Sequence, residues 1–273
     1  LLGEEEGLAQ AASDLQVLHL PQVVRNAQGT PLISSLFNQA RRVNESPILA
    51  YVNSDIILFN DFLETAARLY EQVKRFLMVG QRWDLAVNEP LDFSLGWQER
   101  LHSDCQLRGR LHTPMGSDYF VFPRACFEQI PDFAIGRAGW DNWMIYEARQ
   151  RGWPTVDATR EVLIIHQDHD YSHLPGGQPH YRLPETDENV RLAGGKRHIF
   201  RLTDADLFLK GGKLMHKPLT WSRFWREVEI IPLVKLHSRI LGNFSFVLFH
   251  PRKAYEEWRK AQKNPAAFQE QES

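Results

Sequence analysis

The strongest constraint on the fold comes from two apolar runs, residues 47–52 and 56–59, which are separated by the polar triplet Asn53, Ser54 and Asp55. A strand whose two faces are both covered by helices has a continuous apolar run of this kind, whereas a strand with one solvated face alternates. The two runs therefore predict a central strand of a covered sheet, a sharp turn and a second strand.

Strand and helix patterns alternate along the first 190 residues. Helices are expected at residues 62–73 and 140–151, and strands at residues 76–79, 117–122, 155–157 and 162–165. This order predicts an α/β protein, an open α/β/α sandwich around a mixed central sheet. Residues 81–114 show no period, and we expect them to form the wall or lid of a site.

Helical patterns replace this alternation after residue 190. They predict a helical C-terminal extension over residues 191–263 and a disordered tail over residues 264–273. The apolar run at residues 230–250 is interrupted by Lys235, His237 and Arg239, so it does not suit a bilayer span. A packed helix pair is the expected structure, and peripheral contact with a membrane surface is the alternative.

Composition narrows the class of protein. The net charge of −2 lacks the basic excess of a general nucleic-acid binder, so no nucleic-acid partner is expected. Cys105 and Cys126 form no spacing motif, which favours a reducing compartment and a cytoplasmic protein, with membrane association as the alternative. Leu1, Leu2 and Gly3 have the pattern of a strand that runs into a loop, so we expect the domain to lack its first strand.

Asp55 stands where a nucleotide-binding site is expected. It follows the carboxyl end of a predicted buried strand, which is the edge where open α/β sheets bind ligands. Its carboxylate, with Asn53 and Ser54 beside it, suits Mg²⁺ or Mn²⁺, which bridge a diphosphate and offset its charge. The alternative is that Asp55 only shapes a turn between two strands.

Two other segments are candidates for contacts with an anionic group or a ribose of a donor, or with a sugar hydroxyl. Arg25, Asn26 and Gly29 precede a predicted helix N-terminus, a position that accepts anionic or ribose groups. Asp118 begins a predicted strand, where its carboxylate can bind a sugar hydroxyl or orient the helix of Asp141. The alternative is an aspartate at a strand edge with neither role.

Asp141 is the candidate catalytic residue. It lies in the first turn of a predicted helix, where the helix dipole favours a negative charge. Trp140, Asn142 and Trp143 surround it and can form a sugar-binding wall, and an acid placed there can deprotonate an acceptor hydroxyl. The alternative is a carboxylate that only stabilises the helix end.

Residues 166–173 contain three histidines and two aspartates directly after a predicted strand. Imidazole is a common ligand of transition metals, so the segment is a candidate metal site. His166 is the first choice because it is nearest the strand end, followed by His173 and His169. The alternative is a solvated loop.

The order of these pieces resembles the GT-A class of nucleotide-sugar-dependent glycosyltransferases, and its family 2-like members, over about residues 1–175. In that class a DxD-type motif ends a central strand, a Gly- and Trp-rich segment carries an acid, and a late His or Asp completes the metal shell. The corresponding segments here are residues 51–58, 116–122 and 139–143, followed by His166. The resemblance implies a nucleotide-sugar transferase domain over residues 1–190.

By this resemblance, Asp55, His166 and His173 would hold Mn²⁺ or Mg²⁺ together with the donor diphosphate. Asp141 would be the general base of an inverting reaction, or would position the acceptor in a retaining one. The expected partners are a nucleotide-sugar donor and a glycan, lipid or small-molecule acceptor. Asn53 stands where the class usually has an acid, so metal affinity is lower unless His166 compensates.

Two other functions remain open at this stage. The segment from His166 to His173 would also suit a metal-dependent phosphohydrolase, although such enzymes usually place these ligands on helices. A degenerate GT-A domain that binds glycans or a partner is the non-enzymatic alternative, and Asn53 is the residue that suggests it.

Overall fold

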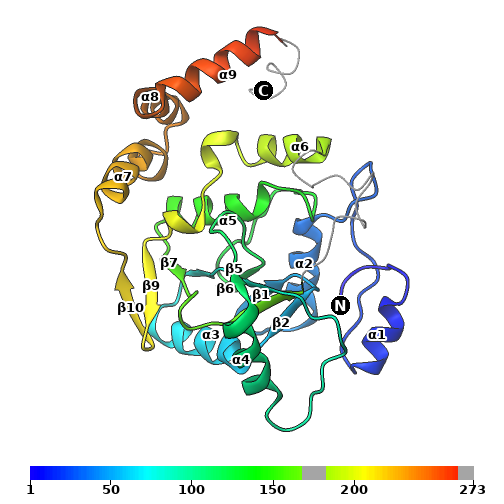
Figure 1. Cartoon of the computed structure of the whole chain (residues 1–273). Coiled ribbons are helices and arrows are strands. Elements are labelled where there is room, and N and C mark those ends of the chain that lie inside the picture. Colours follow the sequence, from blue (N-terminus) through cyan, green and yellow to red (C-terminus); the bar gives the residue numbers. More distant parts are fainter. Residues whose placement is uncertain (168–182, 264–273) are drawn as a thin grey trace.

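The computed structural model, which describes residues 1–167 and 183–263, contains two mixed β-sheets with helices packed against them (Figure 1). The larger sheet has the strand order β1-β6-β3-β7-β9-β10. Its strands are β1 (Ile48–Val52), β6 (Tyr119–Pro123), β3 (Leu77–Val79), β7 (Thr155–Asp157), β9 (Leu207–Lys210) and β10 (Lys213–His216). The predicted α/β class with a mixed sheet is therefore confirmed.

Four strands of the larger sheet end at the same edge. β3, β7 and β9 are mutually parallel, and β1 has the same direction because both β1 and β3 are antiparallel to β6. The carboxyl ends of β1, β3, β7 and β9 therefore lie at the same edge as the start of β6. This is the edge at which a ligand site is expected in such a sheet.

A second sheet lies beside this edge, with the order β2-β8-β4-β5. Its strands are β2 (Ile56–Leu58), β8 (Ile164–Gln167), β4 (Trp83–Leu85) and β5 (Arg110–Leu111). β1 belongs to the first sheet and β2 to the second, so the triplet from Asn53 to Asp55 is the turn that carries the chain from one sheet to the other.

Helices cover both faces of the larger sheet, which explains the continuous apolar runs of its strands. Side chains of α2 (Ile33–Val43) and α5 (Trp140–Gln150) share one core with Leu77 and Val79 of β3. Side chains of α3 (Asn60–Gln72) share a second core with Met78. Because successive residues of β3 point to opposite faces, the sheet is buried on both sides.

Three further helices lie outside these layers. Along the chain, α1 (Leu8–Asp14) comes first, α4 (Trp97–Arg108) follows β4 and precedes β5, and α6 (Pro184–Leu192) precedes β9. The segment predicted to be irregular, residues 81–114, thus contains β4, α4 and β5.

The sheet continues beyond residue 190, where the helical extension was predicted to begin. β9 pairs with β7 and β10 pairs with β9, so residues 207–216 complete the larger sheet. The helices of the extension begin only at Trp221, with α7 (Trp221–Val234), α8 (Arg239–Phe249) and α9 (Pro251–Lys263). The predicted disordered tail, residues 264–273, lies outside the described residues.

The apolar run at residues 230–250 is divided between α7 and α8. Ser245 of α8 donates a hydrogen bond to the carbonyl of Glu229 in α7 (2.8 Å), and Gly242 packs against Leu233, so the expected helix pair is present. Among the described residues, no helix is both long and apolar enough to cross a membrane.

Candidate functional site

Asn53 and Asp118 are joined at the ligand edge of the larger sheet. Val52 pairs with Tyr119 in the register of β1 and β6, so the residues just beyond these strands are adjacent. The backbone N–H of Asn53 donates to the carbonyl of Asp118 (3.0 Å), and its side-chain amide donates to the Asp118 carboxylate (2.9 Å). The Asn53 amide oxygen accepts from the Tyr51 hydroxyl (2.7 Å). Asn53 thereby fixes the Asp118 carboxylate at the strand edge.

Arg82 connects this carboxylate to the second sheet. Its guanidinium binds Asp118 (2.7 Å) and Asp84 (2.8 Å), and both carboxylates are buried. Burial opposes the ionisation of Asp84, but hydrogen bonds from His112 and Arg82 outweigh it and lower the pKa of the carboxyl. Residues 81–114 thus supply Arg82, Asp84 and His112 to the cluster, and none of these three was among the predicted site residues.

His166 lies between two carboxylates because of the register of the second sheet. β8 pairs with β2 on one side, placing His166 opposite Ile56, and with β4 on the other, placing it opposite Asp84. Its Nε2 atom is 3.3 Å from Asp55 and its Nδ1 atom is 3.6 Å from Asp84. The predicted pairing of Asp55 with His166 is therefore present, and the ring is buried.

Asp55 and His166 offer one carboxylate and one imidazole to a metal ion. Among the described residues, no group of three His, Cys, Asp or Glu side chains is arranged to hold a metal. The other predicted ligand, His173, and the weaker candidate His169 lie outside these residues. The donor pair fits Mn²⁺ better than Mg²⁺, because Mg²⁺ prefers oxygen ligands whereas imidazole suits later transition metals.

Asp141 lies in the first turn of α5, as predicted. Burial is the largest influence on this carboxyl, and together with the charge of Asp118 it raises the pKa to about 6, although the N–H groups of Asn142 and Gly139 oppose the shift. Gly139 has a φ of 112°, a conformation that residues with side chains rarely adopt, and its N–H lies 3.2 Å from the Asp141 carboxylate. A carboxyl that titrates near neutral pH is suited to general-base chemistry.

Tyr51 packs beside the start of α5, the helix that carries Asp141. Its ring packs edge-on against Trp140 with the centroids 4.9 Å apart. Burial raises the pKa of its hydroxyl, and the charges of Asp118, Asp55 and Asp141 raise it further. Of the three aspartates, Asp118 is joined to the tyrosine through Asn53, which accepts from the Tyr51 hydroxyl and donates to the Asp118 carboxylate.

The residues predicted to contact a sugar have packing roles. Trp140 and Trp143 are buried in the core, where Trp140 packs on Phe120 and Trp143 on Phe133. Little of either ring is left for a sugar to stack on. Asn142 donates to the carbonyls of Met115 (3.2 Å) and Phe200 (2.6 Å), which fastens the segment before β6 to the start of α5.

The predicted donor-binding loop belongs to a second network. Arg25 donates to the carbonyl of Gly29 (2.9 Å) and to Glu5 (3.0 Å), while Asn26 donates to Glu185 at the start of α6 (2.6 Å). These bonds fix the shape of the loop before α2, and they use the groups that were expected to bind a donor.

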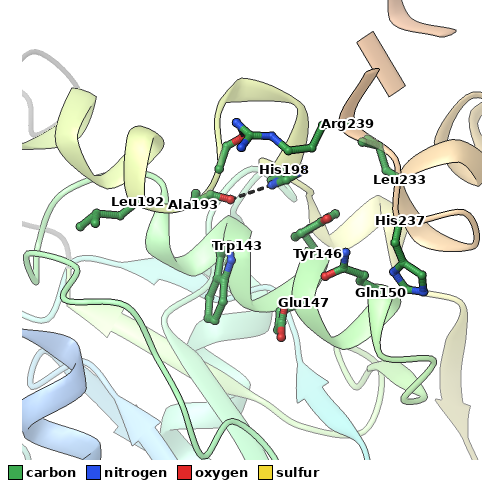
Figure 2. Close-up of a pocket in the computed structure, with 11 residues that line it drawn as sticks. Trp143, Tyr146, Glu147, Gln150, Leu192, Ala193, His198, Leu233, His237 and Arg239 are labelled. Carbon is green, nitrogen blue, oxygen red and sulfur yellow. Dashed lines mark hydrogen bonds between the residues drawn. The ribbon is translucent and has the colours of Figure 1, made fainter. Parts of the chain in front are cut away.

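A pocket of about 260 Å³ lies against the side of α5 that faces away from Asp141. Figure 2 shows the residues that line it. A helix turns by about 100° per residue, so Tyr146 and Glu147, which line the pocket, lie opposite Asp141. The ring of His198 stacks on Tyr146 at 4.0 Å and hydrogen-bonds the carbonyl of Ala193. The pocket is therefore separate from the cluster at the strand ends.

No model of a known protein family matches the chain, and no curated protein is detectably similar to it in sequence. The interpretation of the strand-end cluster consequently depends on its geometry and chemistry.

Proposed function

We propose that the protein is a metal-dependent glycosyltransferase that moves a sugar from a nucleotide-diphosphate donor to a hydroxyl group. The observation that carries this proposal is the position of Asp55, 3.3 Å from His166, and of Asp118, at the edge where open α/β sheets bind ligands. Asp118 accepts hydrogen bonds from Asn53 and Arg82, whereas burial raises the pKa of Asp141. Two carboxylates in such different environments can divide substrate binding and proton transfer between them.

Asp55 and His166 would hold the metal ion, with Mn²⁺ preferred. The ion, when bound, offsets the negative charge of the diphosphate that leaves the sugar. The protein itself supplies the position of the two ligands, because the pairing of β2 with β8 sets Asp55 beside His166.

Asp141 would accept the proton of the attacking hydroxyl. With a pKa of about 6, it is mostly ionised at pH 7 but remains a stronger base than an exposed aspartate. Asp118, held by Asn53 and Arg82, would accept a hydrogen bond from a sugar hydroxyl. In a retaining reaction Asp141 would position the acceptor instead.

A thermal-shift panel tests the binding half of the proposal. UDP, GDP, TDP and CDP are each added with Mn²⁺, with Mg²⁺ or with a chelator, and we expect one of them to raise the Tm only with metal. Asp55→Ala should abolish this shift. Asp141→Asn should retain it while lowering transfer by about a hundredfold or more.

Asp92→Ala is the matched control, because Asp92 is an exposed aspartate of residues 81–114 that pairs with Arg100 (3.5 Å). It should leave the shift unchanged. Full nucleotide binding by Asp55→Ala would contradict the assignment of this site. Metal-dependent release of phosphate from simple phosphoesters, without nucleotide binding, would instead support a phosphohydrolase.

A further inference from the structure

α8 has its apolar side chains on the outside. Ile240 is 82% exposed and Phe244 69% exposed, and Leu241, Val247 and Leu248 are exposed as well. The residues that α8 buries are Gly242 and Ser245. A helix on the surface of a protein in water normally has the opposite arrangement, with its apolar face turned to the core.

Contacts with α7 hold α8 in this orientation. A side chain at Gly242 would bring its Cβ atom to 2.2 Å from a methyl carbon of Leu233, so a larger residue there would force the Leu233 side chain to move. Ser245 is buried and bonded to the Glu229 carbonyl. The small residues of α8 therefore form the face that packs on α7, and its apolar residues are left on the surface.

Aromatic residues extend the apolar surface beyond α8. Trp225 of α7 packs against Phe249 at the end of α8 (5.9 Å between centroids) and against the exposed Trp221 (5.3 Å). Trp258 of α9 is also exposed. Tryptophan is enriched where proteins meet the headgroup region of a membrane, because its ring is apolar and its N–H is polar.

Charge distinguishes between the surfaces that can cover this face. Residues 221–263 contain nine Lys and Arg against four Asp and Glu, a net charge of +5, whereas residues 1–220 contain 23 against 28, a net charge of −5. Exposed cations stand at both ends of α8, with Lys235 before it and Arg252 and Lys253 after it. Two copies of the extension would repel each other, whereas an anionic surface would be attracted.

We infer that α8 and its flanking cations dock on the surface of a bilayer that contains anionic lipids. The apolar face would enter the boundary between headgroups and acyl chains, and the cations would contact the headgroups. α8 and α9 lie at the periphery of the molecule in Figure 1, where such a surface can reach them. The inference is independent of the proposed transferase activity.

Vesicle sedimentation with the full chain tests this docking. We expect the protein to bind vesicles of phosphatidylcholine with phosphatidylglycerol, to bind phosphatidylcholine alone at least tenfold more weakly, and to dissociate as salt is raised. The double variant Ile240→Ser with Phe244→Ser should lower binding by at least tenfold, since both side chains are exposed and contribute to the apolar face. Lys253→Glu should weaken binding to the anionic vesicles selectively.

Leu63→Ser is the matched control, because Leu63 is 72% exposed on α3, far from α8 in the sequence. It should bind vesicles as the parent protein does, and all variants should keep the parent circular dichroism spectrum. Failure of the parent protein to bind anionic vesicles would overturn the inference. So would an equal loss of binding by Leu63→Ser, or a dimer in the absence of lipid that Phe244→Ser dissociates.

Discussion

At the scale of the residue, Asp141 combines a useful proton affinity with a cost in stability. Its pKa is about 6 in the folded protein against an ordinary value of 3.8, so the folded state binds the proton more tightly than the unfolded chain does. Stability therefore falls as pH rises from about 4 to 6, and the ionised carboxylate is destabilising at neutral pH.

Asp141→Asn should consequently stabilise the protein at pH 7.5. The amide keeps an oxygen near the Gly139 N–H but carries no charge. The gain is at most about 3 kcal/mol, since one pKa unit corresponds to about 1.4 kcal/mol. Differential scanning calorimetry from pH 4 to pH 8 measures it, and the gain in Tm should disappear toward pH 4. A variant that is less stable at every pH would contradict the expectation that the ionised, buried carboxylate destabilises the protein at neutral pH.

Arg82 is the residue on which the geometry of the cluster most depends. Arg82→Met removes the cation that two buried carboxylates share, Asp84 and Asp118, so we expect a loss of about 3 kcal/mol in the free energy of unfolding. Arg110→Met is the control, because Arg110 also approaches Asp84 (3.4 Å) but its side chain is 81% exposed. Its cost should be below about 1 kcal/mol in urea denaturation, and similar losses in both variants would contradict the assignment.

At the scale of the element, the buried Arg149 fastens α7 to α5. Arg149 of α5 donates to Glu227 of α7 (2.7 Å) and to the carbonyl of Asp204 (2.6 Å). Arg149→Met should lower the free energy of unfolding by about 2 kcal/mol, because it leaves the Asp204 carbonyl without this donor, whereas Glu227 still binds Arg223 (3.1 Å). Arg151→Met, on the exposed side of α5, is the control and should cost little in the same denaturation experiment.

Apolar runs predicted the strands of the covered sheet, since their signal is local. β9 and β10 were wrongly assigned to the helical extension, although the sequence carries a signal for them. Gly211 and Gly212 both have positive φ and connect two paired strands, which is the two-residue turn that a Gly-Gly pair favours. α4 was not predicted because only Leu101 and Cys105 of its twelve residues are buried, which leaves little helical period to detect.

The strand-end residues of the candidate site could be predicted from the sequence, but the residues that contact them could not. Asp55 and His166 each follow or end an apolar strand, so a rule about sheet edges finds both. Asp84 lies beside His166 because β4 and β8 pair in parallel. The two strands are about 80 residues apart along the chain, and a single sequence does not show which of their residues pair. The burial of Trp140 could not be predicted either, because it depends on packing against Tyr51 of β1 and Phe120 of β6.

At the scale of the whole molecule, the cluster spans the boundary between two sheets. Asp118 directly precedes β6 of the larger sheet, whereas Asp55 directly precedes β2 and His166 lies in β8 of the smaller one. A metal ion with a nucleoside diphosphate that contacts both sides would therefore slow amide exchange in both sheets. Hydrogen-exchange mass spectrometry should show added protection in β6 and in β8, and protection confined to one sheet would contradict a shared site.

The turn from Asn53 to Asp55 has a further consequence, because it is at once a covalent joint and part of the site. The chain crosses between the two sheets at this turn and again between β3 and β4, β5 and β6, and β7 and β8, and Arg82 binds a carboxylate on each side. A ligand that contacts both Asp55 and Asp118 would add a non-covalent bridge between two sheets that the backbone already ties together at several points. Its binding would then stabilise the two sheets as one cooperative unit against unfolding.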